Sequence, residues 1–310
     1  MSTTDVIPDL HGQSAKLAAA LARLGWQRRG TGWRHADPGR RLLFLGDYID
    51  RGPDNAGTIA MVRQIVDSGR GTAIMGNHEL NALQFHRVHP ETGRPLRARS
   101  DKNTRQHARF LAEFPVGERR TAEVLDWMGS LPAVHDGDGF RAVHAAWTDP
   151  AVAGLRRIAP DARLDDGLVL RSADPADPLH VAVETLLKGP EVALPQGHAI
   201  VDKDGTSRTA MRIRWWTGGT PTWRIAALSV PDPDSLPDGP LDASGVPTYP
   251  ADAPPVYFGH YWLTGAPLLQ AANALCLDYS AGRDGPLVTY RHESGAPLSL
   301  DRLQVHPAPA

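Results

Sequence analysis

Five short apolar runs in this sequence each end in a polar motif, and this repetition constrains the fold more than any other feature. Runs of this length and composition are typical of buried strands, which we expect at residues 5–7, 41–45, 72–75, 140–143 and 256–258. The motifs that follow or close them are DLHG (9–12), GDYIDRG (46–52), GNHE (76–79), VHAAW (143–147) and FGHYW (258–262). Because the carboxyl ends of the strands in a layered α/β fold open into one crevice, we expect these motifs to meet in a single site.

Helical periodicity alternates with these strands in the first half of the chain. Apolar residues recur at helical spacing in Ser14–Leu24, which stops before Gly25, and in Asp54–Val66. We expect a further, largely helical region from about Asp101 to Gly129, and two more strands at 275–277 and 287–290. The alternation of strands and helices predicts the α/β class.

The sequence changes in character after residue 150. The segment of about 160–255 holds charged turns, the Trp-rich run Met211–Trp216, and a Pro/Asp-rich stretch, Val230–Pro255, that we expect to be a long irregular loop. A strand that the site needs resumes only at Val256. We therefore expect a single domain over 1–310, in which residues of about 160–255 form an elaboration beside the site.

The motifs offer a set of nitrogen and oxygen ligands. Besides Glu79, their acidic, amide and imidazole side chains are Asp9, His11, Asp47, Asp50, Asn77, His78, His144 and His260. Any one of them alone could be a helix cap, a turn residue or a hydrogen-bonded core histidine, but five such motifs in this order do not arise by accident. The single cysteine, Cys276, lies in an apolar run and excludes both an intrachain disulfide and a thiolate cluster. A nitrogen and oxygen set of this size suits two divalent cations such as Mn, Fe or Zn.

Charge and hydropathy exclude some classes of function. A net charge of −2 argues against general binding of nucleic acid or of an anionic membrane surface. No apolar run reaches 18 residues, and the amino terminus has no basic stretch followed by a long apolar one. We therefore expect a cytoplasmic protein with no membrane partner.

Taken together, the five motifs resemble those of the calcineurin-like metallophosphoesterases. GDYIDRG and GNHE are most similar to the phosphoprotein phosphatase branch, and LCLDYSAGRDGPLVTYRH (275–292) resembles the closing strand pair of that family. The resemblance implies a four-layer α/β/β/α sandwich with a dinuclear metal site at the carboxyl ends of the strands. It also implies hydrolysis by a hydroxide that the two metals share and acidify.

The resemblance further assigns a role to each site residue. It implies that one metal is held by Asp9, His11 and Asp47, and that Asp47 bridges to a second metal. The ligands implied for the second metal are Asp47, Asn77, His144 and His260.

The remaining roles concern the substrate. His78 is expected to be the general acid, Asp50 would orient and charge-stabilise it, and Arg51 would hold the phosphate. Glu79 either orients a metal ligand by a hydrogen bond or makes ordinary hydrogen bonds at the strand end, and the sequence does not separate these alternatives.

Other residues match no motif. We expect surface positions or ordinary hydrogen bonds for nine histidines: His35, His86, His89, His107, His135, His180, His198, His292 and His306. Four arginines could supply a second phosphate contact, although a solvated charge is the commoner role: Arg105, Arg109, Arg212 and Arg214. Trp215 and Trp216 could stack on a nucleobase, but the alternating run that contains them is also typical of a half-buried strand.

Three functions follow from these expectations. The first is a metal-dependent phosphomonoesterase acting on a phosphorylated small molecule, nucleotide or phosphoprotein, which GDYIDRG and GNHE favour. The alternative is a diadenosine tetraphosphate hydrolase, which VHAAW and the CLDYSAG stretch also suit. The third is a catalytically silent binding protein on the same fold, which the presence of every expected ligand argues against.

Overall fold

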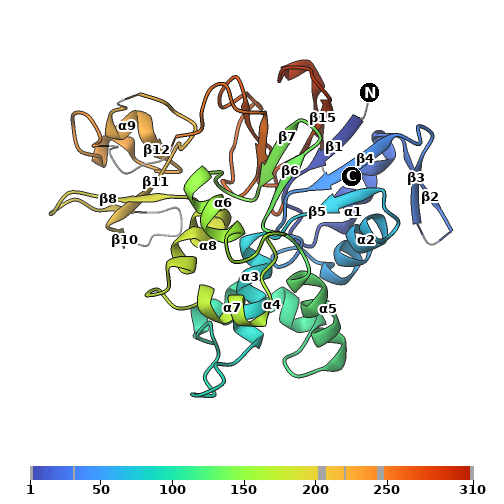
Figure 1. Cartoon of the computed structure of the whole chain (residues 1–310). Coiled ribbons are helices and arrows are strands. Elements are labelled where there is room, and N and C mark those ends of the chain that lie inside the picture. Colours follow the sequence, from blue (N-terminus) through green and yellow to red (C-terminus); the bar gives the residue numbers. More distant parts are fainter. Residues whose placement is uncertain (1–2, 31, 202–206, 220, 243–247, 308–310) are drawn as a thin grey trace.

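The computed structural model describes residues 3–30, 32–201, 207–219, 221–242 and 248–307, and two packed β-sheets form its centre (Figure 1). The first sheet has the strand order β16-β15-β1-β4-β5. Its strands are β1 (Thr3–Ile7), β4 (Arg40–Phe44), β5 (Gly71–Ala73), β15 (Leu287–Glu293) and β16 (Leu303–His306). β1, β4 and β5 are parallel, whereas β15 and β16 are antiparallel to their neighbours.

The second sheet has the strand order β14-β13-β7-β6. Its strands are β6 (Val134–Gly137), β7 (Phe140–Val143), β13 (Val256–Phe258) and β14 (Ala274–Cys276). β7, β13 and β14 are parallel, and β6 pairs with β7 in a hairpin. Three parallel strands in each sheet therefore present their carboxyl ends as loops that can carry functional groups.

Side chains alternate along the strands between two apolar cores. Val6 and Leu43 of the first sheet pack with Phe140 and Tyr257 of the second, so one cluster fills the space between the sheets. The next residue along β1, Ile7, belongs instead to the large cluster that includes the helices. This period of two, with both faces apolar, is what a sheet covered on both sides requires.

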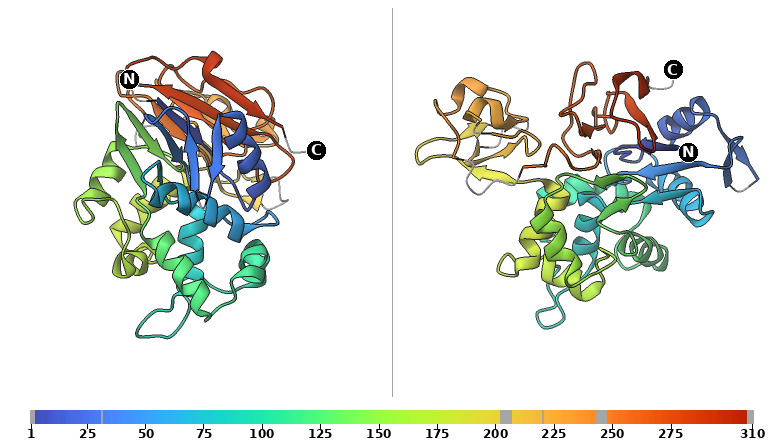
Figure 2. Two further views of the ribbon diagram at one scale, coloured as in Figure 1. Left: turned by 90° about the vertical axis from the view of Figure 1, so that its right-hand side faces the viewer. Right: turned by 45° about the horizontal axis from the view of Figure 1, so that its top comes forward.

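Helices cover the outer faces of both sheets. α1 (Ser14–Arg23) and α2 (Asn55–Asp67) contact the first sheet, and Figure 2 shows them beside β1, β4 and β5. The remaining long helices are α3 (Asn77–His86), α4 (Asp101–Glu113), α5 (Arg119–Gly129), α6 (Asp149–Arg156), α7 (Asp166–Ser172) and α8 (Pro178–Lys188). α6 and α8 pack on each other, and their apolar faces join the same cluster as Val256 and Phe258 of β13. The predicted four-layer α/β sandwich is confirmed.

The strands predicted from the sequence lie within three residues of the observed bounds. The largely helical region expected over 101–129 is confirmed, and it consists of two helices, because a turn containing Pro115 and Gly117 separates α4 from α5. The hairpin of β2 (Trp26–Arg29) and β3 (Gly32–His35) and the helices α3 and α6 were not predicted.

Residues 160–255 divide into two parts. α7 and α8 pack into the main core. Beyond them, β8 (Glu191–Ala193), β11 (Ala210–Ile213) and β12 (Ala227–Leu228) form a small sheet, with β9 (Ile200–Val201), β10 (Ser207–Arg208) and α9 (Trp223–Ala226) nearby. This second part, which we call the small-sheet region (described residues 189–201, 207–219 and 221–241), lies on the left of Figure 1 and has its own apolar cluster.

Val230–Pro255 is irregular as predicted, apart from the short 3-10 helix Pro233–Ser235, within the part of the stretch that the structure describes. Trp215 and Trp216 follow β11 and pack against Phe258, which makes them part of the core. Nothing in the described part of the chain is a helix both long and apolar enough to cross a membrane.

Candidate metal centre

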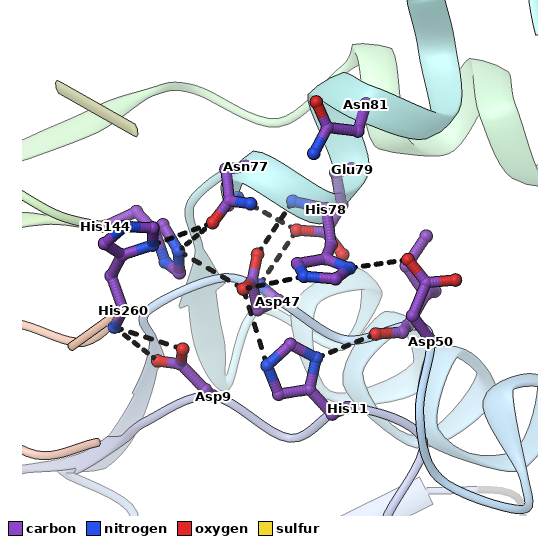
Figure 3. A network of polar contacts seen from close by, with 12 residues as sticks. Asp9, His11, Asp47, Asp50, Asn77, His78, Glu79, Asn81, His144 and His260 are labelled. Carbon is purple, nitrogen blue, oxygen red and sulfur yellow. Dashed lines mark hydrogen bonds and ion pairs between the residues drawn. The ribbon is translucent and has the colours of Figure 1, made fainter. Parts of the chain in front are cut away.

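The motifs that follow β1, β4, β5, β7 and β13 meet at one edge of the two sheets (Figure 3). Asp9 follows β1, Asp47 follows β4, Asn77 begins α3 after β5, and His144 and His260 follow β7 and β13. All five side chains are nine-tenths or more buried. They lie beside a cleft of about 1150 Å³ whose lining includes Asp47, Asn77 and His260. The predicted convergence of distant motifs is therefore what the fold produces.

Asp47 is at the centre of the cluster. Its Oδ2 lies 3.5 Å from Nε2 of His11 and 3.4 Å from Nε2 of His144. Its Oδ1 accepts a hydrogen bond of 2.9 Å from the backbone N–H of His78. One carboxylate thus faces imidazole nitrogens from two different strands, which is the placement a bridging ligand needs.

Backbone carbonyls fix two of the imidazole rings. Nδ1 of His11 lies 3.0 Å from the carbonyl oxygen of Ile49, and Nδ1 of His144 lies 2.8 Å from that of Leu45. A ring that donates from Nδ1 leaves the lone pair of Nε2 free, as metal-binding histidines do. Nε2 of His11 is buried and has no hydrogen-bond partner among the described residues. It is therefore suited to a cation.

Asn77, His144 and His260 form the other side of the cluster. Oδ1 of Asn77 lies 3.0 Å from Nε2 of His144 and 2.9 Å from Nδ1 of His260. Asp9 accepts the backbone N–H of His260 at 3.1 and 3.3 Å, which ties the loop after β13 to the loop after β1. The amide oxygen and two ring nitrogens converge on one point from three loops.

The electrostatics of the cluster show a demand for positive charge. Burial and the neighbouring carboxylate of Asp278 hold the pKa of Asp9 well above its usual value. Burial alone would lower the pKa of His144, but Asp47 and Asp9 raise it to about 10. A divalent cation would satisfy both carboxylates and displace the proton from His144. The donor set and its charge therefore fit metal ions.

Distances between possible ligand atoms give two overlapping groups. One contains His11, Asp47 and His78, and the other contains Asp9, Asp47 and His144. Asp47 belongs to both groups, in keeping with a bridging carboxylate. The groups differ from the expected sets in placing His78 beside His11 and in placing Asp9 with His144.

The backbone of these loops adopts conformations that ordinary residues avoid. Among the described residues, ten other than glycine have a positive φ, and six of the ten lie in the motifs or directly after them: His11, Asp47, Asp50, Arg51, His260 and Trp262. Each such residue costs about 1–3 kcal/mol, and such strain is concentrated at functional sites.

Two glycines make the close approach of these loops possible. A Cβ on Gly76 would clash with Oδ1 of Asp47, and a Cβ on Gly259 would clash with Oδ1 of Asp9. The glycines of the GNHE and FGHYW motifs therefore give room to the two carboxylates.

Both carboxylate oxygens of Glu79 accept hydrogen bonds from the backbone of the motif loops. Its Oε2 accepts the backbone N–H groups of Asp47 at 2.8 Å and Gly76 at 2.9 Å, and its Oε1 accepts that of Tyr48 at 2.8 Å. Burial and the charge of Asp47 raise its pKa to about 7. Glu79 therefore makes hydrogen bonds at the strand ends, and one of them is to the backbone of Asp47, so both alternatives left open by the sequence agree with its contacts.

A second buried carboxylate, Asp278, was not predicted from the sequence. It follows β14 and accepts the backbone N–H groups of Trp262 at 2.7 Å and Ser280 at 3.0 Å. It thereby positions the loop that carries His260. Its place at the carboxyl end of a strand, in CLDYS, is the signal that could have identified it.

His78 is the first of a series of side chains in polar contact that leads away from the cluster. Its Nδ1 lies 2.5 Å from Oδ2 of Asp50, and its Nε2 is 3.9 Å from Oδ2 of Asp47. Burial would lower the pKa of His78, but Asp47 and Asp50 raise it above its usual value. Asp50 therefore contacts His78 as expected.

This series of contacts continues through His107 and His86, for which the sequence predicts surface positions or ordinary hydrogen bonds. Oδ1 of Asp50 lies 2.8 Å from Nδ1 of His107, and Nε2 of His107 lies 3.2 Å from Nε2 of His86. His107 is buried on α4 and holds Asp50 from the side opposite His78. Its approach to Asp50 depends on how α4 packs, which no local pattern reveals.

Arg51 lines the cleft beside these groups. Its guanidinium lies over the ring of Trp262, 4.3 Å from the centroid, and Trp262 stacks in turn on His11. Of the four other arginines considered for a phosphate contact, Arg212 lines the cleft; Arg105, Arg109 and Arg214 are not among the lining residues.

Comparisons with known proteins agree with this geometry. A family model described as calcineurin-like phosphoesterase matches residues 3–188. The asymmetrical bis(5'-nucleosyl)-tetraphosphatase PrpE of Oceanobacillus iheyensis is 38% identical over 74 residues, which are 24% of this chain and 29% of that protein. This chain thus spans less than a third of that relative. The symmetrical bis(5'-nucleosyl)-tetraphosphatase of Ralstonia nicotianae is 25% identical over 267 residues, covering 85% of this chain and 84% of its own.

Two solved structures share the fold at low identity. A protein serine/threonine phosphatase from Saccharomyces cerevisiae has a TM-score of 0.50 at 15% identity and covers 100% of this chain and 81% of its own. A cold-active protein-tyrosine phosphatase of a psychrophilic Shewanella also has a TM-score of 0.50 at 15% identity, covering 94% and 75%.

Proposed function

The chain belongs to the calcineurin-like phosphoesterase family, and on that premise we propose that it is a metal-dependent phosphoric ester hydrolase whose preferred substrates carry more than one phosphate. The observation that carries the proposal is the buried set of carboxylate, amide and imidazole ligands around Asp47, open to a large cleft. The resemblance seen in the five motifs is confirmed at the level of the family.

We assign two divalent ions to the cluster. Asp9, His11 and Asp47 would hold one, and Asn77, His144 and His260 would join Asp47 in holding the other. When bound, the ions would supply a nucleophile at neutral pH and neutralise charge on the phosphoryl group. The residues do not identify the metal, because Mn, Fe and Zn all accept nitrogen and oxygen ligands.

The chain's own residues would then orient the substrate and supply a proton. Arg51, held over Trp262, would bind a phosphoryl oxygen at the cleft. His78 would give a proton to the leaving oxygen from Nε2, because its Nδ1 is engaged by Asp50. Asp50 favours the charged form of the ring, and His107 fixes Asp50 in turn.

The size and lining of the cleft support a substrate larger than a simple phosphate monoester. Its volume of about 1150 Å³ lies somewhat above the usual range of small-molecule sites, about 300–1,000 Å³. Basic residues along it include Arg51, Arg97, Lys102, Arg157, Arg208 and Arg212. Together with the tetraphosphatase relatives, this lining supports a dinucleoside polyphosphate such as diadenosine tetraphosphate. A phosphomonoester is the second candidate, and the similarity of GDYIDRG and GNHE to phosphoprotein phosphatases favours it.

A substrate panel with added Mn²⁺ tests the proposal. It comprises p-nitrophenyl phosphate, its bis ester, a phosphopeptide and diadenosine tetraphosphate. We expect turnover of diadenosine tetraphosphate to exceed that of the others, and the products, two ADP or ATP with AMP, would identify the bond cleaved. Preference for the phosphopeptide would favour the second candidate. No turnover of any substrate by metal-loaded protein would contradict a hydrolase and favour the silent binding protein.

A further inference from the structure

We propose that Arg97 and the three side-chain amides that hold it form a second anion subsite in the cleft, which binds a distal phosphate of a polyphosphate chain. The amides belong to Asn81, Asn103 and Gln106, and all four residues line the cleft. The inference rests on the proposed function and deepens it by naming what recognises the part of the substrate away from the metal ligands.

Within the described part of the chain, the side chain of Arg97 is held by neutral acceptors. Its Nη1 donates to Oδ1 of Asn81 at 3.0 Å, and its Nη2 donates to Oδ1 of Asn103 at 3.0 Å and to Oε1 of Gln106 at 3.5 Å. No carboxylate of a described residue makes an ion pair with it. Amide oxygens orient a guanidinium without neutralising its charge. The three hydrogen bonds leave two of the roughly five N–H donors of the Arg97 guanidinium for a ligand.

Two other cations of the same cleft are paired with carboxylates. Arg171 forms two hydrogen bonds with Asp177, at 2.7 and 3.2 Å, and Lys188 lies 2.5 Å from Oε1 of Glu184. Arg97 differs from these two in being held by neutral amides, without a carboxylate of a described residue at ion-pair distance, although the more distant charges of Glu184 and Asp50 act on it. An anion is the ligand that such a group lacks.

The distance from the metal ligands suits a chain of phosphates. Asn81 follows Asn77 by four residues on α3, so the two side chains share one face of the helix. One turn places Asn81 roughly 6 Å further along the helix axis. Figure 3 shows Asn81 on α3 beyond His78. Asn81, which accepts a hydrogen bond from Arg97, therefore lies about one helical turn beyond Asn77, in the direction in which the next groups of a polyphosphate could extend.

A purely structural role is the competing explanation. Arg97 joins Asn81 on α3 to Asn103 and Gln106 on α4, and a clasp between two helices would also account for these bonds. A clasp predicts a lower melting temperature and equal effects on all ligands. A subsite predicts an effect that depends on the charge and length of the ligand.

The test compares two inhibitors of p-nitrophenyl phosphate hydrolysis, inorganic phosphate and tripolyphosphate. We expect Arg97→Gln to raise the inhibition constant of tripolyphosphate roughly 10- to 100-fold, the value of a charge-assisted contact, and to change that of phosphate much less. Arg97→Lys should recover part of the tripolyphosphate affinity, because lysine keeps the positive charge but loses the three hydrogen bonds to the side-chain amides. Arg94→Gln is the matched control, since Arg94 is exposed, lies three residues away and does not line the cleft.

Equal changes for the two inhibitors, or an Arg97→Lys variant as weak as Arg97→Gln, would overturn the subsite. The subsite would also be overturned if the variants differed in their affinity for an acidic phosphopeptide but not in their affinity for tripolyphosphate. If the wild-type protein hydrolyses nothing, the proposed function fails separately. Calorimetric titration of tripolyphosphate into wild-type and Arg97→Gln protein then decides the subsite, which predicts tighter binding to the wild type, and equal binding would reject it.

Discussion

The motif loops and the small-sheet region face the same cleft, yet they are built in opposite ways. The loops bury charged and polar side chains, among them Asp9, Asp47 and His144. The small-sheet region buries apolar side chains such as Met211 and Ile213 and turns charged ones outward. Arg212, between those two on β11, is directed to the cleft.

The contrast indicates where the chemistry lies. Buried charge and left-handed backbone are costly, and a protein keeps them where function depends on them. The small-sheet region follows the ordinary rule of apolar inside and polar outside, and it needs no function to explain it. We infer that the loops perform the reaction and that the small-sheet region shapes the cleft beside it.

Separating the two roles of Asn77 and His78 is the strongest test of the loops. Asn77→Ala should lose metal and activity together, whereas His78→Asn should keep both metals. Because general acid catalysis contributes typically about 10²–10⁴-fold, His78→Asn should cost that much on an alkyl phosphate and less on p-nitrophenyl phosphate, whose phenolate leaves without help. Metal content and the rates on both esters measure this.

Equal losses on the two esters would remove His78 from proton transfer. If His78→Asn instead lost a metal ion, His78 would be a metal ligand. Its ring lies close enough to the ligand atoms of His11 and Asp47 for this.

Glu79→Gln should have the next largest effect. The substitution replaces one carboxylate oxygen by an NH₂ group that faces backbone N–H donors of Asp47, Tyr48 or Gly76. Loss of such outer support typically lowers metal affinity about 10- to 100-fold. Titration of metal-free protein with Mn²⁺ measures the affinity, and an unchanged value would show that Glu79 serves stability alone.

Ile213→Ala should have the smallest effect on the reaction. The side chain is buried in the apolar cluster of the small-sheet region, and its loss should destabilise that region by about 2–5 kcal/mol. Metal content should stay the same, and the rate on p-nitrophenyl phosphate should fall by less than about threefold, well under the effect of His78→Asn. A variant that loses its metals would show that the two regions are not separable in this way.

The same contrast explains what the sequence could predict. The motif loops could be predicted because Asp, Asn and His at the ends of apolar runs are uncommon, and their order along the chain is informative. The small-sheet region and helices α7 and α8 carry ordinary amphipathic patterns, broken by short turns, that many folds share. Their boundaries therefore could not be predicted.

Contacts that tertiary packing alone creates were also beyond the sequence. His107 reaches Asp50 from α4, 57 residues away, and Arg97 reaches two residues of the same helix from a loop before it. Neither residue belongs to a motif. Whether residues 160–255 could fold apart from the rest stays a prediction: we expect a fragment covering them not to fold cooperatively alone, because α7 and α8 pack into the main core.

The number of metal ions per chain tests the account most directly. We predict about two ions in active wild-type protein, because two ligand groups share Asp47, and less than one in Asp47→Ala, which removes the shared carboxylate. Elemental analysis of both proteins, with activity measured on the same samples before and after chelation, provides the result. Active protein with a single ion or none, or an Asp47→Ala variant that keeps both, would contradict a dinuclear centre bridged by Asp47.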